Sequence, residues 1–142
     1  MSYNTSIEGE LIVNPPLNHQ EIHEFDDIVP SGFGWDELSL RLRVETEDVE
    51  TIEGTLIKRT ASVIVPWSED SFRASEFERH VRQIVDHFGT THDFHGEFEG
   101  HGEDFDDIWR VHVWRDGGGK HRVTKVKAVI TWPTREQGEE LK

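Results

Sequence analysis

The stretch SEFERHVRQIVDHFGTTHDFHGEFEGH, residues 75–101, decides the fold class because its apolar period changes part-way along. In the first half the apolar side chains recur at intervals of four, three and four residues, at Phe77, Val81, Ile84 and Phe88. This is the period of an amphipathic helix. Over residues 92–101 phenylalanine or glycine alternates with polar residues, which is the period of a strand. A helix followed at once by a strand predicts an α+β domain.

The ends of this helix carry two signals. Ser75 and Glu78 are spaced as a capping box, in which each side chain accepts a hydrogen bond from the backbone of the other residue. Gly89 follows the last apolar residue, where a left-handed backbone commonly ends a helix. We therefore expect Ser75 to cap the start of the helix and Gly89 to end it.

Upstream, the sequence predicts a strand and a second helix. Residues 3–13 alternate as a strand, which Pro15-Pro16 ends because proline cannot donate to a ladder. Asn18 and Glu21 form another capping box, for a helix over about 18–28.

A hairpin follows this helix. An alternating strand begins at Leu38, and a turn at Glu53-Gly54 leads into a strand over 55–65. The register that brings apolar residues to one face sets Ile52 opposite Thr55, Val44 opposite Val63 and Leu42 opposite Val65.

Downstream, strands over 108–115 and 122–132 form a meander with 92–101. Setting Glu99 opposite Arg110 places Gly100 opposite Trp109 on the inner face, so that a small residue makes room for a large one. The same register, extended to the last strand, sets Lys127 beside Arg110 and Lys125 beside His112. The expected outer-face ladder comprises Glu97, Glu99, Arg110, His112, Trp114, Lys125 and Lys127.

The order β-α-β-β-α-β-β-β predicts a two-layer α+β sandwich. Its first six elements match the ferredoxin-like arrangement, with an extra C-terminal hairpin beside the fourth strand. We expect a mainly antiparallel sheet of five or six strands with both helices on one face and an open, charged opposite face. Another strand order is the alternative. Residues 1–133 form one domain in this interpretation, and 134–142 a polar tail.

Composition excludes several classes of protein. The 142 residues include no cysteine, so disulfides and thiol chemistry are excluded. There is no apolar run of about 18 residues, which argues against a membrane span. With no signal peptide visible, we expect a cytoplasmic protein. The net charge of −14 makes nucleic-acid binding unlikely, since that binding relies on basic residues neutralising phosphates.

The acidic residues suggest a protein-binding surface. Residues 1–71 hold 15 acidic and 4 basic residues. The acids gather at the end of the first helix, where they oppose the helix dipole, and at the hairpin tip. The candidate surface comprises Glu24, Asp26, Asp27, Glu45, Glu47, Asp48, Glu50 and Glu53. Imitation of DNA phosphates and plain solubility are the alternatives.

Histidines supply the weak metal candidates His87, His92 and His95. Zinc accepts histidine and carboxylate ligands, but this spacing matches no zinc signature, and a surface ladder is the simpler interpretation. No catalytic residues and no cofactor are predicted. Basic residues around Trp114 allow single-stranded nucleic acid in principle, but pairing with Glu97 and Glu99 explains them more simply.

Several phrases together resemble a family of small uncharacterised proteins, a domain of unknown function found in actinobacteria and their phages. They are Tyr3-Asn4-Thr5, Gly9-Glu10-Leu11, Pro15-Pro16-Leu17, Glu53-Gly54-Thr55-Leu56, Ile108-Trp109-Arg110, Asp116-Gly117 and Ile130-Thr131-Trp132-Pro133. The resemblance runs from Tyr3 to Pro133. It implies a cytoplasmic accessory protein in an actinobacterial or phage setting and transfers no catalytic residue.

We therefore expect a small acidic accessory or binding protein, phage-encoded if the resemblance extends to origin, that acts on a host protein through its acidic surface. A metal-dependent or nucleotide-processing enzyme using His87 and His95 is one alternative. A structural phage component is another, because sheet edges can pair between copies. A protein partner is expected, and a homo-oligomer is left open.

Overall fold

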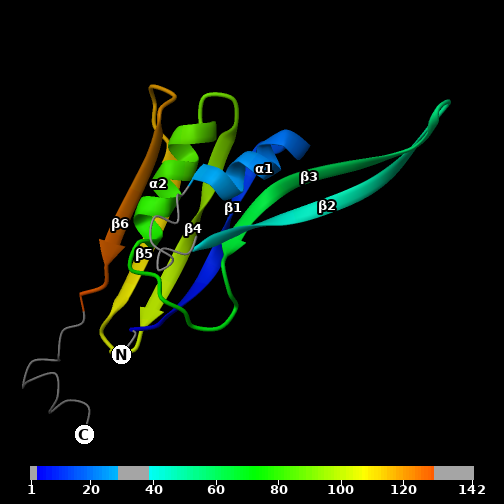
Figure 1. Cartoon of the computed structure of the whole chain (residues 1–142). Helices are drawn as coiled ribbons and strands as arrows, with labels where there is room; N and C mark the ends of the chain where they lie inside the picture. The colour runs from blue at the N-terminus through cyan, green and yellow to red at the C-terminus, as the bar shows by residue number, and fades with distance from the viewer. Residues whose placement is uncertain (1–2, 29–38, 130–142) are drawn as a thin grey trace, which may run out of the picture.

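The computed structural model describes residues 3–28 and 39–129 and confirms the α+β layout (Figure 1). Its elements are β1 (Thr5–Leu17), α1 (His19–Ile28), β2 (Leu40–Thr51), β3 (Gly54–Pro66), α2 (Phe77–Phe88), β4 (Asp93–Gly102), β5 (Ile108–Arg115) and β6 (His121–Lys127). They form one six-stranded sheet of order β2-β3-β1-β4-β5-β6, in which every neighbouring pair is antiparallel. The boundary expected at residue 133 and the tail 134–142 lie outside the described residues.

Both helices pack on one face of the sheet, and the core lies between these two layers (Figure 1). The Phe77 ring of α2 meets the Phe98 ring of β4 edge-on, with 4.9 Å between centroids, and lies 5.6 Å from Trp109 of β5. Burying an aromatic side chain of this size is worth about 1.5–3 kcal/mol. This aromatic contact therefore helps to hold α2 against the centre of the sheet.

The expected register of β4 and β5 is confirmed. Glu99 lies opposite Arg110, and Gly100 lies opposite Trp109. A side chain at Gly100 would overlap the Trp109 indole, so the glycine makes room for the large ring. The opposite charges of Glu99 and Arg110 and the pairing of a small residue with a large one both favoured this register.

The expected register of the β2–β3 hairpin is wrong. The turn is Ile52-Glu53, with Thr51 opposite Gly54 and the Thr51 hydroxyl donating to the Gly54 carbonyl at 2.7 Å. Gly54 has φ +135°, which only glycine adopts readily.

Nearer the sheet, the same hairpin contains an irregularity between Arg43 and Val44 that shifts the pairing by one residue. Val44 lies opposite Ala61 and Leu42 opposite Ile64, in place of Val63 and Val65. The extra residue lies in β3, so Ala61 and Ile64, three residues apart, both reach the core face, while Leu42 and Val44 keep the regular alternation of β2.

The expected register of β5 and β6 is wrong by one residue. Arg110 lies opposite Val126, Trp109 opposite Lys127 and Val111 opposite Lys125. The two lysines consequently lie on the face covered by α2 and not on the outer face. The buried pair Val113 and Val123 explains the shift, since burying apolar side chains outweighs exposed ion pairs of about 0.2–1 kcal/mol.

One predicted helix cap is confirmed and two end signals are wrong. Asn18 and Glu21 bond each other's backbone N–H groups at 2.9 and 3.1 Å, as a capping box does. The helix α2 begins at Phe77 with Glu76 as its N-cap residue, one position later than the Ser75 box requires, and it has no side-chain cap; Glu78 pairs with Arg82 at 2.8 Å. Gly89 stays right-handed, and its N–H continues the helical pattern by donating to Val85.

Candidate functional site

A long two-stranded ribbon, residues 45–59, projects from the rest of the molecule (Figure 1). We call it the arm, and we call the remainder of the described chain the body. β2 and β3 stay paired along the arm to the Thr51–Gly54 pair at its tip. The neighbouring strand β1 pairs with β3 only at Ala61, Val63 and Ile64, so no third strand supports the arm.

Apolar side chains on the arm face solvent. Ile52 at the tip is fully exposed, and Leu56 and Ile57 are 58% and 63% exposed. An isolated two-stranded hairpin is only marginally stable in water, because it lacks a layer on which to bury its side chains. Ile52, Leu56 and Ile57 therefore contribute little to the stability of the fold, because they remain in contact with solvent.

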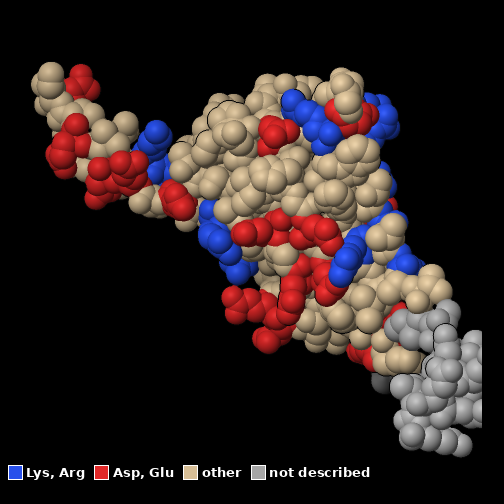
Figure 2. All heavy atoms as spheres, turned by 180° about the vertical axis from the view of Figure 1, so that it is seen from behind, with Lys and Arg blue, Asp and Glu red and all other residues tan. Residues whose placement is uncertain are grey.

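The arm is strongly acidic. Its five carboxylates are Glu45, Glu47, Asp48, Glu50 and Glu53, against the two bases Lys58 and Arg59. Across the described residues none of the five carboxylates forms an ion pair, and Glu50 accepts only a hydrogen bond from the Thr55 hydroxyl at 3.0 Å. Figure 2 shows the acidic side chains along the arm and basic ones near its base.

The predicted acidic surface is divided by the structure. The arm reaches beyond the end of α1, so the acids of α1 and those of the tip do not form one patch (Figure 1). Glu24 lies 3.4 Å from His87 of α2, and Asp27 is exposed. The side chain of Asp26 lies outside the described residues. The acidic residues of the arm therefore form the candidate surface, and the acidic residues at the end of α1 form a separate group.

Residues 1–142 match the family described as Family of unknown function (DUF6205). The chain belongs to this family. No curated protein and no solved structure matches it. An uncharacterised family is what the sequence resemblance implied, while the actinobacterial and phage setting of DUF6205 stays a prediction. Among the described helices of this DUF6205 chain, none is long and apolar enough to cross a membrane.

The outer face of the DUF6205 sheet carries part of the predicted ladder. Arg110 lies 2.9 Å from Glu99 and 3.4 Å from Glu97, and the rings of His112 and Trp114 stack with 6.4 Å between centroids. Lys125 and Lys127 are absent from this face because of the β5–β6 register. The pKa of Glu99 lies below its ordinary value because its carboxylate is hydrogen-bonded, first to His101, which lies 2.9 Å away, and second to Arg110.

Two further carboxylates on this face were not among the predicted site residues. β1 places Glu8 opposite Glu99 and Glu10 opposite Glu97, so four acids occupy adjacent strands (Figure 2). Arg43 of β2 approaches Glu10 at 3.6 Å. Like charges directly opposite are destabilising, so Arg43 and Arg110 offset part of this repulsion. The sequence contained a signal for these two carboxylates. The alternation of residues 3–13 places Glu8 and Glu10 on one face, and the ferredoxin-like strand order places this strand beside the strand that carries Glu97 and Glu99.

We expect Arg110→Gln to raise the pKa of Glu99 toward its ordinary value, as measured by carboxyl NMR titration. The pKa of Glu99 is lower in the folded chain than in the unfolded chain. The contact therefore stabilises the fold at pH values above the unfolded-state pKa, and this stabilisation is lost as the pH falls through the folded-state pKa. The difference in unfolding free energy between wild type and variant should therefore narrow on acidification. A difference that stays constant from neutral to acidic pH would contradict this.

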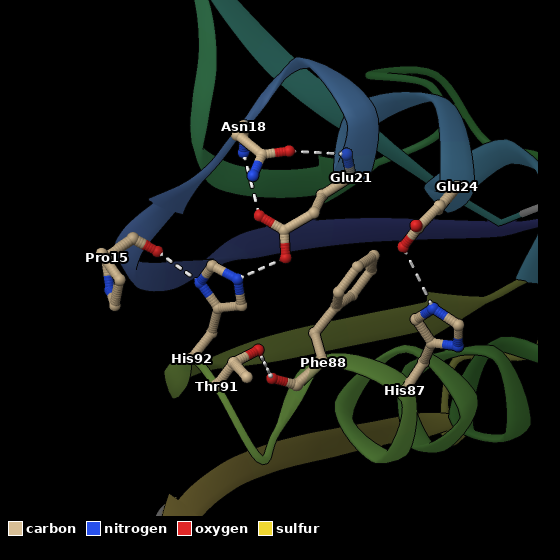
Figure 3. A network of polar contacts seen from close by, with 8 residues as sticks. All are labelled: Pro15, Asn18, Glu21, Glu24, His87, Phe88, Thr91 and His92. Carbon is tan, nitrogen blue, oxygen red and sulfur yellow. Dashed lines mark hydrogen bonds and ion pairs between the residues drawn. The ribbon is translucent and has the colours of Figure 1, made fainter.

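The three candidate metal-ligating histidines are separated. His87 lies on α2, while His95 alternates with buried Phe94 and projects from the outer face of β4. His92 contacts the Pro15 carbonyl and Glu21 (Figure 3). Within residues 3–28 and 39–129 no group of three metal-ligating side chains comes together. The enzyme alternative thus has its two proposed histidines on opposite faces of the sheet.

His92 instead forms a buried structural contact. Its Nδ1 lies 2.6 Å from the Pro15 carbonyl oxygen, and its Nε2 lies 2.6 Å from Glu21 Oε2. A carbonyl and a carboxylate both accept hydrogen bonds, so each ring nitrogen of His92 faces an acceptor. Glu21 also accepts from the Asn18 N–H (Figure 3). The contact joins the end of β1, the start of α1 and the start of β4.

Proposed function

We propose that this DUF6205 chain is a small binding protein whose arm engages a positively charged surface of another protein. The observation that carries the proposal is the arm itself, with five carboxylates free of ion pairs in the described structure and a fully exposed Ile52 at its tip. A partner with basic residues around an apolar recess would complement both features.

The charge of the arm distinguishes among partner classes. β-ribbons can enter the grooves of DNA, but they need basic residues to neutralise phosphates. Anionic membrane surfaces are disfavoured for the same reason. A second copy of this chain would bring the same carboxylates opposite one another, which is destabilising on paired strands. A basic protein surface is the class that remains favoured.

The setting of this activity is part of the proposal. The acidic arm supports an accessory role in which the partner is a larger protein of the same cell, the host cell if the gene belongs to a phage. A cytoplasmic location and an actinobacterial or phage origin stay predictions. The genes that surround this one would test the origin directly.

A photocrosslinking amino acid at position 52 tests the proposal in cells of the organism that encodes the chain. The matched control carries the same group at Thr124, an exposed position on β6 of the body. We expect one covalent adduct from position 52, to a protein with a basic contact surface, that is absent from position 124. Affinity measured with that purified protein should fall at least tenfold for Glu47→Lys combined with Glu50→Lys.

Three outcomes would overturn the proposal. The first is an adduct of twice the chain's own mass, because it would assign the arm to self-association. The second is the same set of adducts from positions 52 and 124, and the third is no adduct from position 52. An identified partner whose affinity is unchanged by the charge reversals would contradict the electrostatic part.

A further inference from the structure

A pocket of about 430 Å³ lies on the helix-covered face, at the end of the sheet opposite the β4 start, and it gathers basic side chains. The start of β1, the end of β6 and the segment that enters α2 meet there (Figure 1). The lining includes Arg73, Lys125 and Lys127. A volume of this size lies within the range of small-molecule sites, roughly 300–1,000 Å³.

The three bases lack acidic partners in the described structure. Arg110, Arg115 and Arg122 of the same hairpin pair with carboxylates at 2.7–3.1 Å on β4 and in the β5–β6 turn. By contrast, Lys125 lies over the Trp109 ring at 5.0 Å from its centroid, and neither Lys127 nor Arg73 has an ion pair among the described residues. Three like charges around one hollow repel each other unless an anion lies between them.

Local backbone contacts fix the position of this hollow. Thr5 and Phe72 exchange two backbone hydrogen bonds, of 2.8 and 2.9 Å, which hold Arg73 beside the start of β1. The β5–β6 register places Lys127 opposite Trp109 and therefore on the same face as Thr5. The basic groups come from two distant segments that the fold brings together.

Hydrogen-bond donors also line the pocket. The Thr5 side chain is only 6% exposed, and its hydroxyl forms no hydrogen bond within the part of the chain that the structure describes. The positive end of α2 begins directly after the lining residues Ala74 and Ser75, and Glu76 provides no side-chain cap. The Thr5 hydroxyl is not among the buried unsatisfied atoms of the described residues, so it reaches the pocket's solvent and can donate a hydrogen bond to a ligand there.

One acidic residue reduces the positive charge of the pocket. Asp107 lines it and accepts a hydrogen bond from the Tyr3 hydroxyl at 2.7 Å. The pocket thus holds three positive charges and one negative, in a chain of net charge −14. The Trp109 ring is packed between Gly100 and Lys125, so it offers little surface for an aromatic ligand to stack on.

We propose that this pocket binds the phosphate group of a small organic phosphate, held by Arg73, Lys125 and Lys127 with the Thr5 hydroxyl. A doubly charged phosphate matches three cations better than a carboxylate does, and arginine and lysine are its common ligands. The space beyond the phosphate accommodates a small polar group such as a sugar. The site is separate from the arm and does not depend on the arm's partner.

Calorimetry on the full chain at low salt, with inorganic phosphate and with ribose 5-phosphate, tests the site. We expect saturable binding of one ribose 5-phosphate per chain, tighter than inorganic phosphate. Arg73→Gln and Lys127→Gln should each weaken it at least tenfold, and Asp107→Asn should tighten it by removing the opposing charge. Lys58→Gln, which removes one lysine from the arm, is the matched control and should leave the affinity unchanged.

The indole N–H signals in NMR spectra locate the ligand. Trp109 should shift on titration, while Trp114, on the outer face, should not. Absence of saturable binding, or equal weakening by Lys58→Gln, would overturn the proposal. Tighter binding of a single-stranded oligonucleotide than of ribose 5-phosphate would overturn the small-molecule assignment. Circular dichroism of each variant confirms that a loss of binding does not reflect unfolding.

Discussion

Replacement of His92 by alanine is expected to lower the free energy of unfolding by about 3 kcal/mol, because it leaves polar groups of a buried contact unsatisfied, at a cost of about 1–3 kcal/mol each. His92 is 6% exposed, and its ring nitrogens lie 2.6 Å from the Pro15 carbonyl oxygen and 2.6 Å from Glu21 Oε2. Without the ring, the Pro15 carbonyl and one Glu21 oxygen lose their hydrogen-bond partner in a part of the molecule that water reaches poorly. Urea unfolding at neutral pH measures the difference.

A histidine–glutamate contact on the surface provides the control. His101 lies 2.9 Å from Glu99, but its side chain is 48% exposed. His101→Ala should therefore cost less than about 1 kcal/mol, as exposed ion pairs do. Equal losses for the two histidine variants would mean that burial does not set the strength of the His92 contact.

Glu21→Gln separates the His92 contact from the helix cap. Glutamine can still accept from the Asn18 N–H, so the capping box remains possible in this variant. His92→Ala should then cost less in the Glu21→Gln background than in wild type, by an interaction energy of about 0.5–3 kcal/mol. Fully additive losses would show that His92 acts through packing and the Pro15 carbonyl alone.

The sequence identified the Asn18–Glu21 cap but not the His92 contact, and the reason is distance along the chain. Capping boxes lie within one helical turn, so their spacing is visible in the sequence. The contact between His92 and Glu21 spans 71 residues and depends on how β1, α1 and β4 pack. Periodicity alone could place His92 next to a strand but could not supply its partner.

The two strand registers of the meander illustrate which forces can be judged from sequence. The β4–β5 register was predicted correctly because two observations agreed: the pairing of Glu99 with Arg110 on the outer face and the steric fit of Gly100 with Trp109 on the inner face. The β5–β6 register was predicted by extending that arrangement to the last strand, which set Lys125 and Lys127 in the outer row, and it was wrong. Burial of Val113 against Val123 is worth more than an exposed ion pair, so the apolar pair decides the register of these two strands.

The projection of the arm was also missed, although its sequence contains a signal. Alternation of apolar and polar residues ends after Val44, and both faces of the following strand are polar: Glu45, Thr46, Glu47 and Asp48. A strand that is polar on both faces has no layer on which to pack. The point where it leaves the sheet depends on the end of β1, which the hairpin sequence does not contain.

Excision of the arm is expected to abolish partner binding while leaving the body folded. Residues 46–59 can be replaced by Asn-Gly, because Glu45 lies directly opposite Thr60 and this dipeptide closes two-residue hairpins. The free energy of unfolding should change by less than about 1 kcal/mol, since no core residue is removed and surface changes are usually small. Because this variant lacks residue 52, crosslinking from that position cannot be used, and binding is measured with the purified partner.

A variant that keeps the arm tests the contribution of its apolar side chains separately from that of its backbone and carboxylates. Ile52→Ser combined with Leu56→Ser leaves the paired backbone and all five carboxylates in place and removes exposed apolar surface. We expect it to weaken binding less than excision does and to preserve the salt dependence that the carboxylates confer. Unfolding of the excised chain would show that the arm is a structural strand of the domain. Full partner affinity in that chain would move the binding site to the body, where the outer face carries Glu8, Glu10, Glu97 and Glu99 on adjacent strands.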